Sequence, residues 1–301
     1  YNFGNGILSA EGDTKSPLLF LFISGIFNVV LDLLLVIHFK MDIAGVAIAS
    51  VVALYVSAFL VFIKLHRKND SLALRFSKLK VNKSKFVRLL KIGIPAGMQN
   101  AIFGFANLFI QIGVNSFDAS MVVANSAASN SDPLVYNVMS AFYVACSTFI
   151  GQNYGAGKKS RVLKSYFISL ACSFFFALFL GLLLFAFGRN FISIFISDPA
   201  IVELGMKRLS IMACSYCISA FMDCTIAASR GLGQTSVPTV IVILGSCVFR
   251  IAWIFTVFAY FKTIESLYLL FAFSWTITAA AEIFYFAKLY KQKFSVSALK
   301  A

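Results

Sequence analysis

The chain has 301 residues, of which 60% are hydrophobic and 13% charged, and 26 Lys and Arg against 12 Asp and Glu give a formal net charge of +14. An ordinary soluble domain is about 45–50% apolar and about 25% charged, so this composition excludes a soluble protein and predicts a polytopic membrane protein. The six cysteines lie in apolar stretches without the spacing of a disulfide framework, and we expect them to pack as small apolar side chains.

Apolar runs of about 18 or more residues predict transmembrane helices. In chain order we expect spans at 17–39, 43–64, 92–117, 119–153, 166–187, 201–228, 237–261 and 264–287, after the end of another helix at 1–10. The span 119–153 is rich in polar residues and is interrupted at Asp132–Pro133. Such a break is tolerated only inside the protein or along a cavity. The predicted fold class is an all-α membrane protein with about eight transmembrane helices.

A basic segment separates the first two spans from the others. Residues 64–91 carry ten Lys or Arg and one Asp. With this segment in the cytoplasm and the spans alternating, twenty Lys or Arg fall on the cytoplasmic side and five on the outer side. This asymmetry satisfies the positive-inside rule and predicts a cytoplasmic linker and C-terminus. It also explains the net charge without a nucleic-acid partner.

The segment GQNYGAGKKSR, residues 151–161, has the composition of a phosphate-binding loop without its spacing. A P-loop requires a glycine, four residues and then Gly-Lys-Ser/Thr. Counting back from Gly157–Lys158 reaches Gln152, and Lys159 occupies the position of the hydroxyl residue. We therefore expect a cytoplasmic turn after a helix, in which the glycines allow a tight reversal.

Two stretches of the chain share a pattern that indicates an internal repeat. GDTKSP from Gly12 and GQTSVP from Gly233 each open a long apolar run, and the two glycines are 221 residues apart. Each run leads through a short outer turn into a last helix, and both copies run in the same direction. This is the pattern of two helical bundles related by an axis along the membrane normal. If both bundles are complete, roughly 135 further residues precede Tyr1 in the whole protein.

The repeat divides the chain into three parts. Residues 1–64 are expected to hold the end of a fourth helix and the fifth and sixth helices of a first bundle. Residues 65–91 are the basic cytoplasmic linker, and residues 92–301 are expected to form a complete second bundle of six helices.

Five motifs, in their order and spacing, resemble the MATE (multidrug and toxic compound extrusion) family of transporters. They are AEGDTKSP, KIGIPAGMQN, FIGQNYGAGK, SDPAIVELGMKRL and SRGLGQTSVP. The resemblance implies twelve helices in two bundles with a cavity between them. It implies a secondary active antiporter that exports organic cations or drugs in exchange for H⁺ or Na⁺ by alternating access. It further implies a monomer in a bacterial plasma membrane that uses no cofactor.

Three acidic residues inside predicted spans are candidates for ion coupling, because a charged side chain in a span is costly and usually functional. Asp132 is the strongest candidate, since it lies among several amides and hydroxyls and the family commonly has an acid there. The family also often has an acid near Asp223, although pairing of Asp223 with Arg250 as a structural contact is an alternative. Asp32 is the weakest, because the family often shows Asp-Pro where this chain has Asp32–Leu33.

The positions of amide side chains indicate which residues line the substrate cavity. Asn100, Asn107 and Gln111 recur at i, i+7 and i+11, which places them on one helix face. Such a face lines either a cavity or a contact between helices. Together with Asn125, Tyr136 and Asn137, these side chains suit a flat organic cation through hydrogen bonds and cation–π contacts. Some branches of the family carry a Glu on the helix of Asn100, and its absence here counts against a Na⁺ site built on it.

Three other classes of protein fit the sequence less well. A flippase for lipid-linked saccharides is the main alternative, but it would need several intramembrane cations. We count only Arg250 as intramembrane and assign Lys207 and Arg208 to the outer side. A membrane enzyme would need clustered catalytic or metal-binding residues, and His38 and His66 are predicted on opposite sides of the membrane. We therefore predict no catalytic residue and no metal site. A structural protein without transport does not explain the buried acids.

Overall fold

The computed structural model describes residues 1–68, 73–75 and 80–297, and all regular structure in these ranges is helical. The chain divides into two compact units, Tyr1–Asn82 and Lys83–Ala301. The second unit begins nine residues before the predicted boundary at 92, because its first helix already starts at Lys83 in the basic segment. Residues 69–72 and 76–79 of the predicted linker lie outside the described residues.

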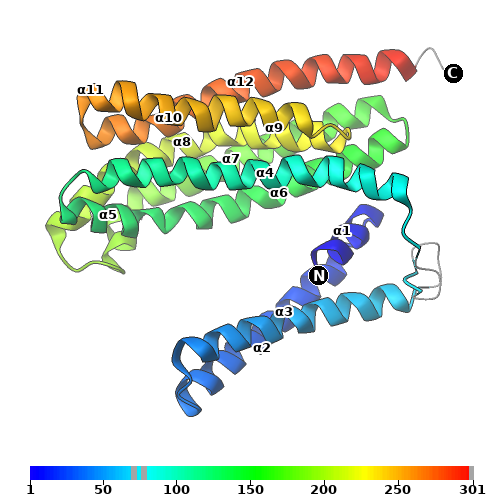
Figure 1. Cartoon of the computed structure of the whole chain (residues 1–301), viewed down its shortest axis with the longest axis horizontal. Helices are drawn as coiled ribbons and strands as arrows, with labels where there is room; N and C mark the ends of the chain where they lie inside the picture. Colours follow the sequence, from blue (N-terminus) through cyan, green and yellow to red (C-terminus); the bar gives the residue numbers. More distant parts are fainter. Residues whose placement is uncertain (69–72, 76–79, 298–301) are drawn as a thin grey trace. The chain divides into compact units, whose positions relative to one another are not determined.

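The first unit is a pair of long helices with a short helix beside it (Figure 1). Its elements are α1 (Asn2–Glu11), α2 (Lys15–Leu33), the π-helix η1 (Leu34–His38) and α3 (Asp42–His66). Every fourth residue of α3 is buried, and most of these residues are small, from Gly45 through Ala49 and Ala53 to Ser57. Small side chains let helix backbones approach closely in a membrane. The spacing of this stripe therefore explains why α2 and α3 pack along their length.

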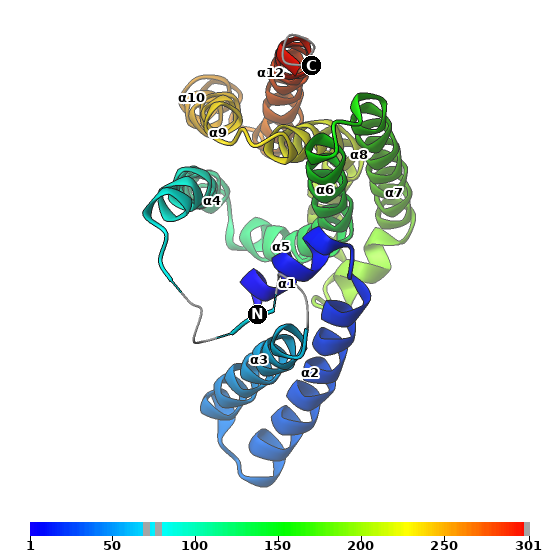
Figure 2. The ribbon, with the colours of Figure 1, turned by 90° about the vertical axis from the view of Figure 1, so that its right-hand side faces the viewer.

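The second unit is a helical bundle with α8 at its centre. Its elements are α4 (Lys83–Asn115), α5 (Ala119–Ser129), α6 (Ser131–Gly155), α7 (Lys159–Ser193), α8 (Pro199–Gly231), α9 (Ser236–Val242), η3 (Ile243–Val248), α10 (Phe249–Trp253), η4 (Ile254–Phe258), α11 (Ala259–Phe261) and α12 (Ile264–Ser297). α8 packs against α5, α6, α7 and α12 (Figure 2). A β-carbon added at Gly181 of α7 would lie 2.3 Å from the carbonyl oxygen of Ala213, so the crossing of α7 and α8 depends on that glycine.

Seven helical segments of the described chain are long and apolar enough to cross a membrane. They are Lys15–His38, Asp42–His66, Ala119–Gly155, Lys159–Ser193, Pro199–Gly231, Ser236–Phe261 and Ile264–Phe294. Each corresponds to a predicted span. The remaining predicted span, 92–117, lies within α4, a helix of 33 residues whose first turns are basic and which contains Pro95.

The break in the polar span lies at Asn130, where α5 ends and α6 begins. The predicted break is confirmed, but it precedes Asp132–Pro133 instead of falling on it. Pro133 sits in the first turn of α6, where a missing N–H leaves no hydrogen bond unmade. The chain therefore bends just before the proline, and Asp132 points from the first turn of the new helix.

The two segments of the proposed repeat make the same turn. Gly12 has φ 101° and Gly233 has φ 78°, both in the left-handed region that favours glycine. The amide of Asp13 donates to the carbonyl of Leu8 at 2.9 Å, and the amide of Gln234 donates to that of Ser229 at 3.1 Å. Both are helix ends of the Schellman type. The backbone thus repeats at the 221-residue offset that the sequence pattern predicts.

The glycine-rich segment GQNYGAGKKSR also forms a turn. α6 ends at Gly155 and α7 begins at Lys159, with Gly157 at φ 69° between them. The amide of Lys158 donates to the carbonyl of Asn153 at 2.9 Å and closes the helix end. The prediction of a tight turn between two helices is confirmed.

Candidate functional site

A cavity of about 460 Å³ opens inside the second unit. Five elements line it, namely α4, α6, α8, α10 and α12, and its wall combines aromatic rings, amides, thioethers and three charged groups. The lining residues are Gln99, Asn100, Phe103, Asn107, Asp132, Pro133, Tyr136, Asn137, Met139, Met212, Tyr216, Ser219, Met222, Asp223, Arg250, Phe271 and Trp275. Six of the nine predicted site residues are among them.

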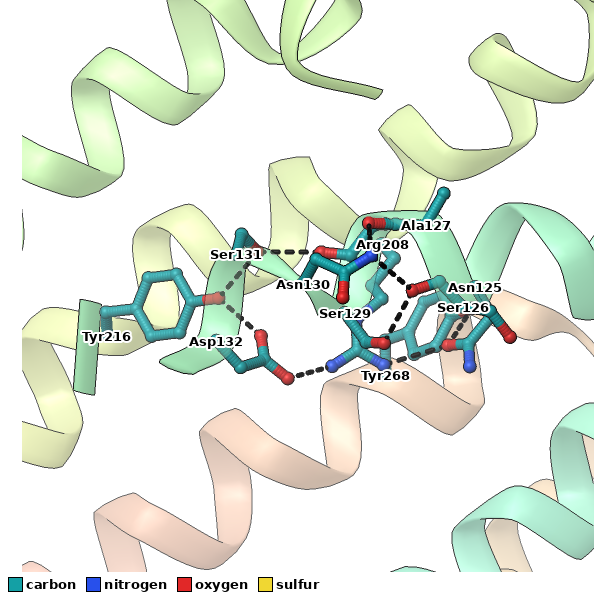
Figure 3. Close-up of polar contacts among 11 residues, drawn as sticks. Asn125, Ser126, Ala127, Ser129, Asn130, Ser131, Asp132, Arg208, Tyr216 and Tyr268 are labelled. Carbon is teal, nitrogen blue, oxygen red and sulfur yellow. Dashed lines mark hydrogen bonds and ion pairs between the residues drawn. The ribbon is translucent and has the colours of Figure 1, made fainter. Parts of the chain in front are cut away.

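Asp132 is held by two donors from α8 (Figure 3). The guanidinium Nη2 of Arg208 donates to its Oδ2, and the hydroxyl of Tyr216 donates to its Oδ1 at 2.6 Å. The Asp132 side chain remains 35% exposed, toward the cavity that it helps to line. Asp132 is therefore an ion-paired carboxylate at the edge of a cavity.

Asn125 completes this cluster from α5. Its Oδ1 accepts from Nη1 of Arg208 at 2.8 Å and from the hydroxyl of Tyr268 at 3.0 Å. Asn125 is buried and lies behind Arg208, outside the cavity lining. Its amide thus orients the arginine that pairs with Asp132, and Asn125 does not face the cavity as a predicted substrate contact would.

Arg208 is the partner that the sequence did not reveal. The charge count assigns it to the outer side of the membrane, together with Lys207. Lys207 does reach a surface partner, Glu265, at 2.9 Å, whereas Arg208 is 5% exposed and faces the interior. Adjacent residues on a helix point about 100° apart. The position of Lys207 therefore does not predict that of Arg208, and a count of charges by loop cannot separate the two.

The guanidinium group of Arg250 is surrounded by aromatic rings. Its guanidinium carbon is 4.7 Å from the ring centroid of Phe271, 5.5 Å from that of Phe103 and 5.9 Å from that of Trp275. Its Nε donates to Ser274 Oγ at 3.2 Å, and the residue is 2% exposed. No carboxylate of the described chain is within ion-pair distance of it. The predicted alternative, a direct Asp223–Arg250 ion pair, is therefore not what α8 and α10 form.

The predicted amide face of α4 divides between two environments. Asn100 and Asn107 line the cavity, together with the neighbouring Gln99. Gln111 lies outside the lining and its amide donates to Asn115 Oδ1 at 2.8 Å, one turn further along α4. Two of the three predicted residues of this face, Asn100 and Asn107, therefore line the cavity.

A second polar cluster lies beside the cavity, toward the other end of α8. Gln99 Oε1 accepts from Arg230 Nη2 at 2.8 Å and from the hydroxyl of Thr239 at 3.4 Å. Glu282 of α12 is fully buried and interacts electrostatically with Arg230. Arg208 and Arg230 both belong to the candidate span Pro199–Gly231, so Arg250 is not the only arginine in a candidate span of the described chain.

Asp32 belongs to the first unit, in α2. Its Oδ1 and the Nδ2 of Asn28, one turn earlier, are buried without hydrogen-bond partners in the part of the chain that the structure describes. The two side chains lie one turn apart on α2 of the first unit. No three His, Cys, Asp or Glu side chains of the described residues gather closely enough to hold a metal ion.

Comparison of the sequence with known proteins gives one family and several bacterial relatives. The model of the family described as MatE matches residues 95–256. A protein named FAD transporter, from Shewanella oneidensis, is 31% identical over 221 residues, which are 71% of this chain and 48% of the relative. A probable multidrug resistance protein NorM from Thermotoga maritima is 24% identical over 267 residues, 86% of this chain and 56% of the relative. The chain thus spans about half the length of these relatives.

Solved structures of similar shape are membrane transporters. A mutant of the Vibrio cholerae MATE transporter VcmN has a TM-score of 0.87 at 20% identity and covers 97% of this chain, which covers 66% of it. A MOP-superfamily transporter from Pyrococcus furiosus has a TM-score of 0.89 at 16% identity, with the same coverage. These likenesses confirm the predicted fold class, an all-α bundle belonging to a twelve-helix architecture.

Proposed function

The chain belongs to the MatE family, and from this premise we propose that the whole protein is a secondary active antiporter. It exports small organic cations or drugs in exchange for H⁺ or Na⁺ by alternating access, and it is a transporter and not an enzyme. The names of relatives support this proposal, among them a multidrug export protein of Staphylococcus aureus and two probable multidrug resistance proteins of Bacillus subtilis.

The cavity of the second unit is the observation that carries the proposal. It combines rings such as Tyr136 and Trp275 with amides such as Asn100 and Asn137 and with the carboxylate of Asp223. Aromatic faces attract a desolvated cation by about 2 kcal/mol, and amides add hydrogen bonds that tolerate different cargo shapes. A volume of about 460 Å³ falls in the range of cavities that hold drug-sized ligands.

The two carboxylates of the cavity suit different roles. Asp132 already has a cationic partner in Arg208, so a proton or Na⁺ that binds Asp132 must loosen the contact between α6 and α8. Asp223 has no ion-pair partner within 4 Å among the described residues and faces the cavity. We therefore assign ion coupling first to Asp132 and attraction of a cationic cargo to Asp223. H⁺ and Na⁺ both remain candidates for the coupling ion.

The location follows from the same premise. Seven segments of the described chain have the length and composition of membrane spans, and the relatives are bacterial. We propose the bacterial plasma membrane, with the basic linker and the C-terminus in the cytoplasm, and a monomer surrounded by lipid as the functional unit.

A flux assay on the whole protein tests the proposal. In proteoliposomes with a pH or Na⁺ gradient, we expect export of ethidium, a flat aromatic cation, and a loss of at least tenfold in Asp132→Asn. Asp198→Asn is the matched control, since Asp198 caps α8 at an exposed position and Asn caps equally well. Unchanged ethidium flux in Asp132→Asn would refute the assignment of Asp132 to ion coupling.

Arg250 favours a second candidate cargo, an aromatic compound that carries a phosphate or carboxylate. It lies in the cavity wall beside three rings and has no carboxylate partner among the described residues, and one relative is named an FAD transporter. An anionic aromatic cargo would stack on the rings and pair with the guanidinium. FAD uptake into proteoliposomes that is lost in Arg250→Gln, with ethidium flux absent, would decide for this candidate.

A further inference from the structure

Glu282 is a buried acid that neither the cavity nor the Asp132 cluster uses. It is 0% exposed in α12, and neither carboxylate oxygen has a hydrogen-bond partner in the described part of the chain. Burying an ionised carboxyl without a hydrogen-bond donor is far more costly than burying the neutral acid. A bound proton therefore makes this position tolerable, and release of the proton requires a cation that reaches the carboxyl.

Arg230 of α8 is that cation, and it is held away from the acid. It interacts electrostatically with Glu282, but its Nη2 donates at 2.8 Å to Gln99 Oε1. Its Nε is buried and has no partner among the described residues. Arg230 and Glu282 thus each carry polar atoms that only a rearrangement can satisfy.

The other groups around this pair do not replace Arg230. Tyr285, on the same helix as Glu282, is the other titratable group that interacts with the acid electrostatically. α9 contributes the uncharged hydroxyl of Thr239, which donates to the same amide oxygen as Arg230. Asp223 acts on Arg230 along α8 and competes with Glu282 for its charge.

We propose that Glu282 is a proton-binding site of the transport cycle and that Gln99 and Arg230 control it from the cavity. This inference rests on the proposed antiport function. Gln99 lines the cavity, so a cargo that donates a hydrogen bond to its amide oxygen displaces Arg230. The guanidinium then pairs with Glu282, the O–H bond of the acid breaks, and the proton passes to water on the cytoplasmic side. Cargo binding and proton release thereby become one event.

Infrared difference spectroscopy of the whole protein in detergent tests the site without any cargo. Subtracting the spectrum of Glu282→Gln isolates the C=O stretch of the protonated Glu282 carboxyl. We expect this band in the wild type at pH 7, its loss at that pH in Gln99→Leu, where Arg230 is freed, and its persistence to higher pH in Arg230→Gln. Absence of the band in the wild type, or an unchanged band in Gln99→Leu, would overturn the proposal.

Proton release on cargo binding tests the coupling. Ethidium, whose two aromatic amino groups can donate hydrogen bonds, is added to weakly buffered protein, and a pH electrode reports the protons released. We expect release by the wild type and by Glu265→Gln, a matched Glu at the outer end of α12 whose partner is the surface residue Lys207, and at least a halving in Glu282→Gln. Equal release in all three proteins contradicts the proposal. If the wild type exports no cation at all, the proposed function fails, and the infrared titration still decides whether Glu282 is a proton site.

Discussion

The two ends of α8 each place an arginine beside an acid from another helix, but only one of the two pairs is formed. At one end Arg208 contacts Asp132, and both groups have further hydrogen bonds. At the other end Arg230 donates to Gln99 while Glu282 has no donor. The two arginines are 22 residues apart, roughly 33 Å along the helix, a distance comparable to the thickness of a hydrocarbon core, about 30 Å.

The difference shows that proximity of opposite charges does not make an ion pair. A buried pair is favourable only when the remaining donors and acceptors are also satisfied. Tyr216 and Asn125 supply those partners to Asp132 and Arg208, and nothing equivalent reaches Glu282 in the described residues. The first pair therefore holds α5, α6 and α8 together until an ion binds Asp132, whereas the second pair forms only when Arg230 leaves Gln99.

Removal of Arg208 should have the largest effect on stability. Arg208→Met removes the cation paired with Asp132, which keeps only the Tyr216 hydroxyl, while Asn125 keeps that of Tyr268. We expect a loss of about 3 kcal/mol in the free energy of unfolding. This value is the lower end for a broken buried pair, because Asp132 keeps 35% of its side chain exposed. Thermal or denaturant unfolding in detergent measures it. Arg189→Gln, which removes an exposed pair with Glu203, is the control without a measurable change, and equal stability of both variants would contradict the distinction between the regions.

Loss of the tyrosine hydroxyl should have an intermediate effect. Tyr216→Phe removes the 2.6 Å hydrogen bond to the Asp132 carboxylate, and bonds to charged groups contribute about 1.5–3 kcal/mol. We expect a destabilisation of about 1.5 kcal/mol in the same unfolding assay. Tyr260→Phe, at a residue that is 82% exposed, should match the wild type. A neutral Tyr216→Phe would mean that Arg208 alone holds the carboxylate.

Removal of Arg230 should have the smallest effect on stability. Its comparison with Arg208→Met distinguishes most clearly the pair that is formed from the pair that is not. With Glu282 neutral, Arg230→Met breaks only the bond to Gln99, whose oxygen still accepts from Thr239. We expect a destabilisation of about 1 kcal/mol or less. A loss as large as that in Arg208→Met would show that Arg230 neutralises an ionised Glu282.

The sequence predicted the fold well because hydropathy and charge asymmetry act over whole helices. The spans, the break before Asp132 and the turns at Gly12 and Gly233 follow from apolar length and from glycine's access to positive φ. The site was predicted in part. Gln111 shares a helix face with Asn107, but its amide donates to Asn115 on the same helix. A helix face several turns long contacts more than one neighbouring element, so its residues do not all line the same cavity.

The sequence does not predict which side chains contact the site residues. Arg208 and Lys207 are adjacent cations, and only the packing of α8 against α5 and α6 turns one inward and leaves the other at the surface. In the sequence, Glu282 lies near the end of the predicted span 264–287, where a boundary charge is ordinary. Its complete burial depends on how α12 packs against α8, a contact between segments about fifty residues apart in the chain.

Gradient-driven export tests directly whether the whole protein exchanges an organic cargo for an ion. Purified whole protein is reconstituted into proteoliposomes loaded with ethidium, and export is followed with a pH gradient, with a Na⁺ gradient and with neither. We expect export that one of the two gradients drives and that stops when that gradient is dissipated. Ethidium and FAD movement that is absent, or equal with and without each gradient, would contradict it.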